Sequence, residues 1–529
     1  LVLVLLAVIG LTCSITAQYF AAKAAVGFST GLRHALFEHI QKLSFSEMDT
    51  VGTSTLITRM TSDINQTQNG VNLVLRLFLR SPFIVFGAMI MAFTIDVKAA
   101  LVFVVTIPLL SVVVFGIMLV SIPLYKKVQS ALDKVLGITR ENLTGSRVIR
   151  AFNKEDDEIA DFNNSNDALT KIQLYVGKIS ALMNPLTYVI INGAVVVLVW
   201  TGAIRVNSGY ITQGEVVALV NYMSQILVEL IKLANLIINI NKSIACGNRI
   251  QAIFELQPSI TDHAMTPVAE KKAEHSGEVP EVVFSHVGLT YAGAGEESLT
   301  DIDFTVKKGE TIGIIGGTGS GKSSVVNLIP RFYDATKGSV QIEGKDVREY
   351  SLEELRGKIG MVLQKAVLFK GTIRENMLWG NENATDEDIM QALEVAQAKE
   401  FVDKKEGGLD FEIEQGGKNL SGGQRQRMTI ARAVVKKPDI LILDDSASAL
   451  DFATDAKLRM AIRDMENKAT VFIVSQRAAS IMYADKIIVL DDGQIVGMGT
   501  HEELLKQCEV YQEIYYSQFK KTEDEKEGR

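Results

Sequence analysis

The chain has 529 residues, a length that predicts about two to four domains. Its residues are 47% hydrophobic and its mean hydropathy is +0.18, which is high for a soluble protein. A net charge of −8 and an isoelectric point near 5.5 argue against nucleic acid as a partner, and three scattered cysteines are too few for a disulfide framework or a metal cluster.

The chain opens with an apolar run that lacks the charged start and the cleavage site of a signal peptide. A membrane core about 30 Å thick needs about 20 mostly apolar helical residues to cross it. Five segments meet that requirement, and we interpret each as a membrane span: Leu1–Val26, Leu77–Ile95, Ala99–Ile122, Ile179–Ile204 and Val216–Ile240.

Two connections between these spans are long and carry most of the Lys and Arg of this half, which predicts that they lie in the cytosol. With five spans and a cytosolic carboxyl half, Leu1 would lie outside the cell, so we expect one further span before it; a natural five-span protein is the alternative. Helical apolar spacing continues into both connections. Their tips, near Glu47–Thr53 and Phe152–Glu158, are therefore expected to contact a cytosolic domain.

Polar residues interrupt the last span at helical spacing. At about 100° per residue they fall within an arc of roughly 120° on one helix face. Polar and ionised groups at membrane depth face water or protein, so this stripe predicts the lining of a translocation path. Hydrogen bonding between helices, with Glu229 and Lys232 simply paired, is the alternative. The stripe consists of Asn221, Gln225, Glu229, Lys232, Asn235 and Asn239.

The carboxyl half changes character, because apolar strand-like runs alternate with helical patterns, as in a parallel sheet with crossover helices. The predicted fold class is an α-helical polytopic membrane domain followed by an α/β P-loop NTPase domain. We divide the chain into a membrane domain, a linker, a nucleotide-binding domain and a charged tail, at residues 1–245, 246–279, 280–520 and 521–529.

A glycine-rich loop follows the predicted strand Thr311–Ile315 and precedes a helical pattern, which is the context of a P-loop. Backbone N–H groups of such a loop surround phosphates. The side chain of Lys322 is placed for the β- and γ-phosphates and that of Ser323 for Mg²⁺. The predicted ATP-binding residues here are Gly316, Gly317, Thr318, Gly319, Ser320, Gly321, Lys322, Ser323 and Ser324.

Two further motifs narrow the class of nucleotide-binding domain. The buried-strand run Ile440–Leu443 ends in Asp444 and Asp445, where a carboxylate can hold Mg²⁺ opposite the P-loop. The segment Leu420–Gln424 (Leu-Ser-Gly-Gly-Gln) lies about a hundred residues after the P-loop and twenty before that strand. An ordinary helix cap does not explain a Ser-Gly-Gly run at this combined spacing.

With these motifs the sequence resembles the ATP-binding cassette family, and specifically the fused half-transporters of the type IV exporter class. The resemblance covers both halves of the chain. It implies that Tyr291 stacks on adenine, that Gln364 reaches Mg²⁺ together with Ser323 and Asp444, and that Asp451 belongs to the loop that links two ATP sites. It also implies that the signature residues complete a partner's ATP site: Leu420, Ser421, Gly422, Gly423 and Gln424.

Two catalytic positions depart from the family pattern. The family's general base is a glutamate, and this chain has Asp445 there; the family's switch histidine is replaced by Gln476. Aspartate is about 1.5 Å shorter in reach, and a misplacement of about 1 Å can cost about 10²-fold in rate. Glutamine cannot become cationic as histidine does.

The sequence is thus similar to the degenerate-site subunit of heterodimeric bacterial multidrug exporters. This resemblance implies ATP-driven efflux of amphipathic compounds across the cytoplasmic membrane, with ATP and Mg²⁺ as cofactors, the lipid bilayer as surroundings and a second half-transporter as partner. Hydrolysis would occur mainly at the composite site that the signature segment completes. A homodimeric exporter with a slow ATPase and a non-transporting ATP-gated switch or channel subunit are the alternatives.

Overall fold

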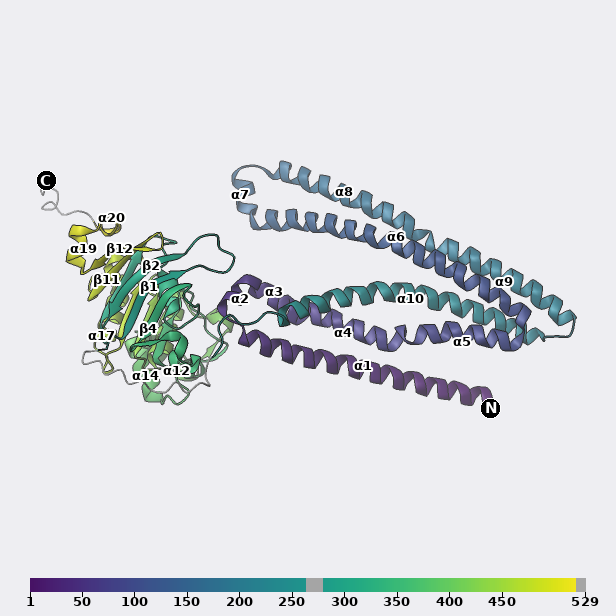
Figure 1. Cartoon of the computed structure of the whole chain (residues 1–529), viewed down its shortest axis with the longest axis horizontal. Coiled ribbons are helices and arrows are strands. Elements are labelled where there is room, and N and C mark those ends of the chain that lie inside the picture. The colour runs from purple at the N-terminus through teal and green to yellow at the C-terminus, as the bar shows by residue number, and fades with distance from the viewer. Residues whose placement is uncertain (263–278, 520–529) are drawn as a thin grey trace. The chain divides into compact units, whose positions relative to one another are not determined.

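The computed structural model describes residues 1–262 and 279–519, and the chain divides into two units (Figure 1). Unit 1 consists of Leu1–Gln41 and Ser54–Leu256, and unit 2 of Lys42–Thr53 and Gln257–Arg529. The predicted charged tail lies outside the described residues, as do residues 263–278 of the predicted linker.

Unit 1 contains the membrane helices. Among the described residues, five helices are long and apolar enough to cross a membrane, and each covers one of the five predicted spans, the first from Val2 onward, which confirms these predictions. Three of these five run without interruption, and the other two consist of several consecutive helical segments. The elements of this half are α1 (Val2–Lys42), α3 (Thr53–Thr58), η1 (Arg59–Asp63), α4 (Ile64–Leu73), η2 (Val74–Phe78), α5 (Arg80–Ile95), α6 (Val97–Thr144), α7 (Ser146–Ala151), α8 (Glu155–Ala181), α9 (Met183–Asn207) and α10 (Gln213–Phe254).

Polar side chains cap the N-terminal ends of two of these helices, α6 and α10. Asp96 precedes α6 and accepts a hydrogen bond from the Ala99 backbone N–H at 2.8 Å. The guanidinium of Arg205, near the end of α9, donates to the same carboxylate from Nε at 3.0 Å. Thr212 and Glu215 form a capping box at the start of α10. These polar groups satisfy helix ends that would otherwise leave N–H groups without partners.

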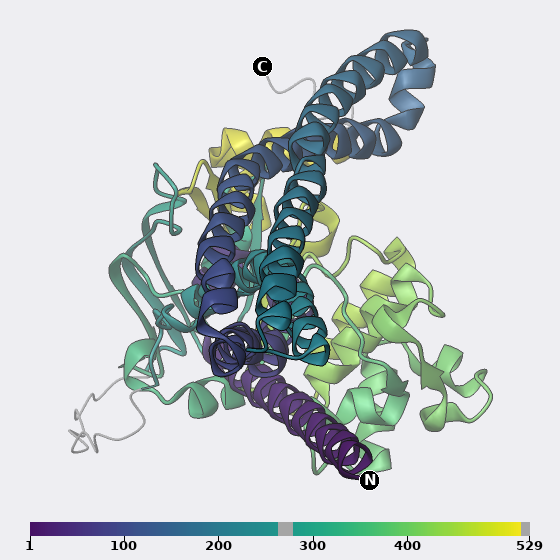
Figure 2. The same ribbon diagram turned by 90° about the vertical axis from the view of Figure 1, so that its right-hand side faces the viewer.

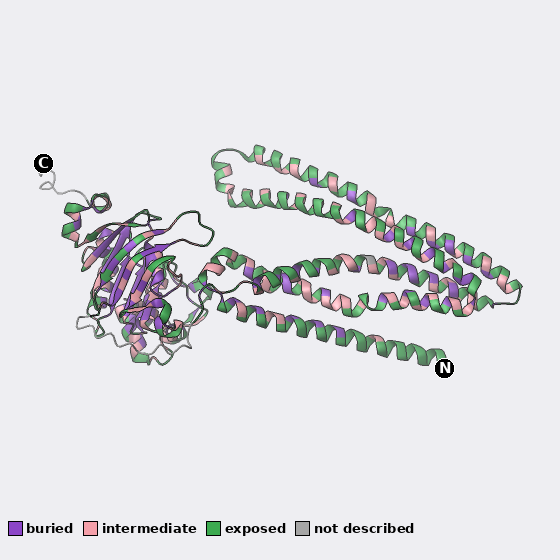
Figure 3. Cartoon of the chain, viewed as in Figure 1, coloured by how far each residue is buried: buried purple, intermediate pink, exposed green. Residues whose placement is uncertain are grey.

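Small residues let the helices of unit 1 approach closely. Gly202 packs against Val216, and a Cβ at Gly70 would lie within 3.0 Å of the Ser243 side chain. An apolar core joins α5, α6, α9 and α10 and includes Ala92, Ala99 and Phe103. Helices α6 and α8 lie side by side (Figure 2). Helix α1 stays largely exposed in Figure 3, as expected for an apolar helix that faces lipid or other membrane helices.

Unit 2 is an α/β domain built on two sheets and a two-stranded ribbon. The six-stranded sheet has the order β12-β11-β3-β10-β9-β6, and its β11, β3, β10, β9 and β6 pair in parallel. A four-stranded antiparallel sheet has the order β2-β1-β4-β5. The strands are β1 (Val282–Leu289), β2 (Leu299–Val306), β3 (Thr311–Gly316), β4 (Lys337–Ile342), β5 (Lys345–Asp346), β6 (Ile359–Val362), β7 (Gly371–Thr372), β8 (Glu412–Ile413), β9 (Ile440–Asp444), β10 (Thr470–Val474), β11 (Lys486–Asp491) and β12 (Gln494–Gly499).

Two hydrophobic cores cover the faces of the six-stranded sheet. Alternate residues of one strand point to opposite faces. In β10, Val471 and Ile473 join one core, whereas Phe472 and Val474 join the other, which also receives the four-stranded sheet. The helices of unit 2 are α2 (Phe45–Val51), α11 (Lys322–Leu328), η3 (Val347–Glu349), α12 (Leu352–Lys358), α13 (Ile373–Leu378), α14 (Asp386–Val395), α15 (Lys399–Asp403), η4 (Gly408–Asp410), η5 (Gln415–Gly417), α16 (Gly422–Val434), α17 (Phe452–Arg463), α18 (Ala478–Ile481), α19 (His501–Gln507) and α20 (Glu509–Gln518).

Helix α2 comes from the first long connection between membrane helices, yet it packs within unit 2. The ring of Phe45 lies 4.5 Å from that of Phe332, centroid to centroid, and the Tyr333 hydroxyl donates to the Asp49 carboxylate. Ser44 accepts a hydrogen bond from the Ile260 N–H at 3.0 Å. The expectation that this loop tip contacts the cytosolic domain is confirmed.

Candidate functional site

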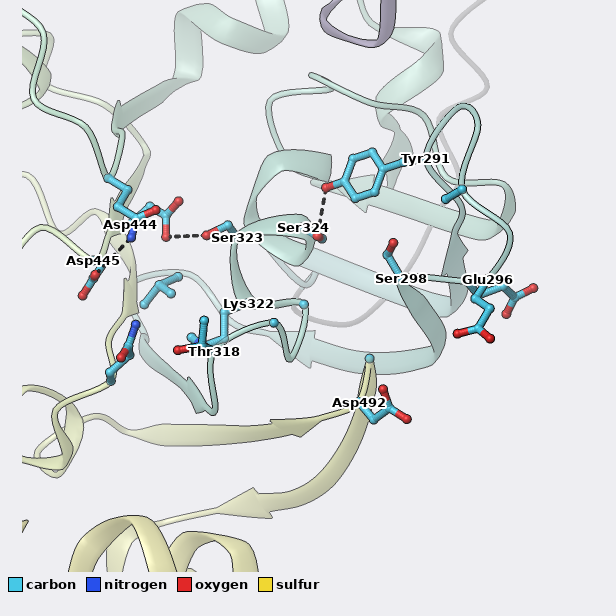
Figure 4. Close-up of a pocket in the computed structure, with 18 of the residues that line it drawn as sticks. Tyr291, Glu296, Ser298, Thr318, Lys322, Ser323, Ser324, Asp444, Asp445 and Asp492 are labelled. Atoms are coloured by element: carbon cyan, nitrogen blue, oxygen red, sulfur yellow. Dashed lines mark hydrogen bonds between the residues drawn. The ribbon is translucent and has the colours of Figure 1, made fainter. Parts of the chain in front are cut away.

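The carboxyl ends of three adjacent parallel strands assemble the site. In the sheet register Val474 of β10 lies opposite Ile314 of β3 on one side and Asp444 of β9 on the other. The residues that follow these strands therefore meet at one edge, where ligands bind in open parallel sheets. They border a cavity of about 800 Å³ (Figure 4).

Most of the predicted ATP-binding residues line this cavity. They include Tyr291, Thr318, Gly319, Gly321, Lys322, Ser323, Ser324, Gln364, Asp444, Asp445 and Gln476. The P-loop backbone needs glycine at two places in particular: Gly321 has a φ of +90°, and a Cβ at Gly316 would overlap the carbonyl oxygen of Leu490. Both conformations hold the loop close against the sheet.

Lys322 is buried at the first turn of α11. Its ammonium donates to the carbonyl oxygens of Gly316, at 2.9 Å, and of Gly317, and to the Ser320 hydroxyl at 3.3 Å. Burial lowers the pKa of Lys322, and the carboxylates of Asp445 and Asp444 oppose that shift. A cation held in this way by the loop itself is suited to meet phosphate oxygens.

Ser323 and Asp444 form the centre of the candidate magnesium site. The Ser323 hydroxyl donates to the Asp444 carboxylate at 3.0 Å, and burial raises the pKa of Asp444. Gln364 also lines the cavity, and its Nε2 lies 3.3 Å from the carboxylate of Asp445, the residue next to Asp444. Hydroxyl, carboxylate and amide oxygens are hard ligands of the kind that Mg²⁺ takes, with one or two carboxylates completed by phosphates and water. The residues present therefore fit the ion.

Asp445 has an unusual backbone conformation, with a φ of +45°. Its N–H donates to the Val474 carbonyl at 3.0 Å, and its carboxylate accepts a hydrogen bond from Gln364 Nε2 at 3.3 Å. Left-handed backbone at a residue other than glycine costs of order 1–3 kcal/mol and tends to occur at functional sites. The contacts with β10 and Gln364 hold the side chain at the cavity wall.

A series of aromatic contacts connects Tyr291, which lines the cavity, to α2. The Tyr291 hydroxyl donates to Ser324 Oγ at 2.9 Å, and the ring of Tyr291 meets that of Tyr333 edge-on at 5.0 Å. Tyr333 in turn contacts Asp49 and Phe45 of α2. Burial and the Asp49 carboxylate raise the pKa of Tyr333. Tyr333 therefore joins the predicted adenine position to a loop of the membrane half, and the sequence alone gave no signal for it.

The cavity also has walls that were not predicted. Glu296, Ser298 and Asp492 line it, as Figure 4 shows. Asp492 and Gly493 form the turn between β11 and β12, and both have positive φ. Because β11 pairs in parallel with β3, this turn emerges beside the P-loop. The sequence signal for it was an Asp-Asp-Gly turn after an apolar run.

Several predicted residues lie outside this cavity. Ser421 caps α16 through a capping box with Gln424, so that Leu420–Gln424 form the start of that helix. Asp451 caps α17. In unit 1, Asn221, Gln225 and Lys232 of the polar stripe are exposed, whereas Glu229 accepts hydrogen bonds from Ser81 at 2.9 Å and from Lys232 at 3.0 Å.

A P-loop cavity in an α/β domain that follows five membrane-crossing helices defines an ATP-driven membrane transporter. Residues 1–230 match the ABC transporter transmembrane region, and residues 299–448 match the family ABC transporter. The chain belongs to the ATP-binding cassette transporter family. It is a multi-pass membrane protein with a cytosolic ATPase domain.

Relatives match both halves of the chain. An uncharacterised ABC transporter ATP-binding protein of Mycobacterium tuberculosis is 38% identical over 97% of this chain and 88% of its own length. An ATP-dependent lipid A-core flippase of Desulfotalea psychrophila is 33% identical over 92% of this chain and 84% of its own length. The structure of a bacterial Atm1-family ABC exporter with ATP bound is similar with a TM-score of 0.73 at 23% identity, covering 94% of this chain and 86% of that one. The fold is that of these exporters.

Proposed function

We propose that the chain is one half of a heterodimeric exporter that uses ATP to expel amphipathic compounds across the cytoplasmic membrane. Its own ATP site binds ATP with Mg²⁺ but is weak in hydrolysis. The observation that carries this proposal is the pair Asp445 and Gln476, which line the ATP cavity at the positions of the family's general base and switch histidine.

The side chain of Asp445 is short for a general base. Glutamate at this position would reach about 1.5 Å further, and a displacement of about 1 Å can cost about 10²-fold in rate. A positioned general base contributes about 10²–10⁴-fold to a rate. Val474 fixes the backbone of Asp445, and Gln364 binds its carboxylate, so little movement is left to make up the missing length.

Gln476, which follows the neighbouring strand β10 and also lines the cavity, supports the same conclusion. An amide donates and accepts hydrogen bonds but does not titrate, so it neither carries a positive charge nor transfers a proton. Lys322 and the P-loop backbone keep the groups that bind phosphate. Retained binding groups together with altered catalytic groups describe a site that holds ATP longer than it hydrolyses it.

Magnesium fits this arrangement. Ser323, Asp444 and Gln364 would hold the ion, which offsets the negative charge of the phosphates when it is bound. The buried Asp444 supplies the charged ligand, and the hydroxyl of Ser323 already lies against it.

The intact signature segment supports a composite second site. Its serine and glutamine form a capping box at the start of α16, and Ser421, Gly422 and Gln424 are at least partly accessible to another molecule. A helix start with free N–H groups favours anions. Ser421 would therefore act at the ATP held by the partner, where most hydrolysis takes place.

The polar stripe on α10 is the proposed route for substrates. Asn221, Gln225 and Lys232 are exposed on a helix whose remaining sequence is largely apolar. Ionisable groups at membrane depth mark substrate pathways by default. One relative is named an ATP-dependent lipid A-core flippase, and the lipid in that name is an amphipathic molecule. This name agrees with a proposed substrate that has both polar and apolar parts.

Steady-state ATPase of the reconstituted pair tests the asymmetry. Asp445→Ala in this chain should reduce turnover only modestly, because the site already lacks most base catalysis. Glu→Gln at the matching position of the partner should abolish turnover, as should Ser421→Ala here. If Asp445→Ala is as severe as the change in the partner, the two sites are equal catalysts and the proposal is wrong. An active pump formed by this chain alone would establish a homodimer instead.

A further inference from the structure

The turn after β10 is held from outside the ATP site. It consists of Ser475, Gln476, Arg477 and Ala478 and is called the switch turn below. Gln518, at the end of α20, contacts it with both ends of its amide: Nε2 donates to the Gln476 carbonyl at 2.8 Å, and Oε1 accepts from the Ala478 N–H at 2.9 Å. One side chain 40 residues beyond Ala478 in the sequence thus binds two backbone groups on either side of Arg477.

The switch turn also forms hydrogen bonds with the Ala447–Leu450 loop, which leads into Asp451. The guanidinium of Arg477 donates to three backbone carbonyls there, those of Ala447, Ser448 and Leu450, at 3.1–3.3 Å. Its guanidinium carbon lies 5.1 Å from the ring centroid of Phe452. A displacement of the switch turn would therefore move Gln476 at the ATP cavity and loosen the Ala447–Leu450 loop together.

Helix α20 is anchored well enough to act as a fixed support. Tyr511 is fully buried, and its hydroxyl lies 2.7 Å from His501 Nδ1. The rings of Tyr515 and Phe519 stack at 4.7 Å between centroids, and α20 packs on β3, β11 and α18. Gln518 lies between Tyr515 and Phe519, so the helix that carries it is positioned by packing outside the ATP cavity.

We propose that Gln518 is a positioning residue of the ATP site, which holds the switch turn and through it both Gln476 and Arg477. The two hydrogen bonds to backbone groups fix the turn in place without contacting nucleotide. Helix α20 thereby sets how long this chain retains ATP. The proposal extends the proposed function but does not depend on whether the site hydrolyses ATP.

The test uses the full-length chain in lipid nanodiscs, a fluorescent non-hydrolysable ATP analogue and Mg²⁺. Gln518→Met keeps the length of the side chain and removes both hydrogen bonds. The analogue should dissociate about fivefold faster or more, the factor that one net hydrogen bond contributes. Hydrogen exchange should quicken at the Ala478 amide, whose acceptor has been removed. Because the analogue is not hydrolysed, a failed degenerate-site assignment would leave this result unchanged.

Gln512→Met is the matched control. Gln512 lies on the same helix, and its Nε2 donates at 2.7 Å to the carbonyl of Leu505, away from the switch turn. This variant loses a similar side-chain hydrogen bond, so it should leave analogue release and Ala478 exchange as in the parent. Equal release rates for the parent and Gln518→Met, or equal acceleration in both variants, would overturn the proposal.

Discussion

At the scale of single residues, the ATP site contains a charge that costs folding free energy. Asp444 is buried at the end of β9, and burial raises its pKa above the ordinary value of 3.8; Asp445 adds to the shift, whereas Ser323 and Lys322 oppose it. A raised folded-state pKa means that the ionised carboxylate destabilises the folded chain at neutral pH. Function explains why it is kept, because the carboxylate is the charged ligand proposed for magnesium.

Asp444→Asn should therefore stabilise the nucleotide-free chain. At pH 7.5 we expect the melting temperature to rise by about 2 °C or more, the scale on which 1 kcal/mol moves a domain of this size. The cost of the charge is fully present above the folded-state pKa and disappears as the pH falls through it, so the gain should shrink on acidification. Stabilisation by ATP with Mg²⁺ should be lost in the same variant.

Asp492→Asn is the control for this prediction. Asp492 lines the same cavity but is exposed, and asparagine tolerates its positive φ of +44°. Its substitution should change the melting temperature little and leave the response to Mg²⁺ in place. A melting temperature of Asp444→Asn below that of the parent at pH 7.5 would contradict the interpretation of Asp444 as a destabilising buried charge.

At the scale of elements, charge pairs and small residues join helices that are distant in the sequence. Asp63 in η1 is buried, and its carboxylate binds the Arg249 guanidinium of α10 through two hydrogen bonds, at 3.0 and 2.5 Å. Arg59 donates to the same carboxylate at 2.8 Å. Further along the pair of helices, Gly70 of α4 meets Ser243 of α10. These contacts fix the cytosolic ends of the two helices against each other.

Gly70→Ala should separate these helices. The added Cβ would lie within 3.0 Å of Ser243 Cβ and Oγ, and overpacking of this kind typically costs about 1–3 kcal/mol. Ser243→Gly removes both atoms, so the double variant should recover part of the loss even though Ser243→Gly alone also destabilises by loss of its bonds to Gln66 and Asn239. Thermal unfolding in detergent of the parent, the two single variants and the double variant measures the coupling free energy between the two positions. Strict additivity of the two losses would show that the contact is not tight.

Sequence patterns predicted those features that depend on residues close to one another in the chain. The five spans, the P-loop and the Asp444 strand are local signals, and parallel pairing of β3, β9 and β10 brings them together without further information. Tyr333 and Gln518 were not predicted, because their partners lie far away in the sequence and only packing brings them to the site. The π-helical segments η1 and η2 also left no pattern in the apolar spacing.

At the scale of the whole molecule, the membrane half presents apolar helices outward and a polar stripe on α10. Exposed side chains of the stripe suit a test of the substrate route better than Glu229, which also bonds to Ser81 of α5. The proposed transport role of the stripe can therefore be tested without breaking the contact between Glu229 and Ser81. The nucleotide half in turn contains the P-loop cavity, which Asp445 and Gln476 line, and, outside that cavity, the signature segment Leu420–Gln424.

Gln225→Leu should change which compounds the assembled transporter exports while basal ATPase stays near that of the parent. The reason is that Gln225 is exposed, so its removal alters the surface offered to substrate without breaking a core contact. Transport of several amphipathic dyes into inverted vesicles measures this. Val228→Leu, at an exposed apolar position of the same helix, is the control and should keep the parent profile. A uniform loss of transport and folding in Gln225→Leu would favour helix packing as the role of the stripe.

The central claim is that this chain holds ATP while its partner hydrolyses it. The most direct measurement is a single turnover of the reconstituted pair with radiolabelled azido-ATP and Mg²⁺, followed by crosslinking, separation of the two chains and analysis of the nucleotide on each. We predict ATP on this chain, crosslinked near Tyr291, at times when the partner already carries ADP. ADP appearing on both chains at the same rate would contradict the account.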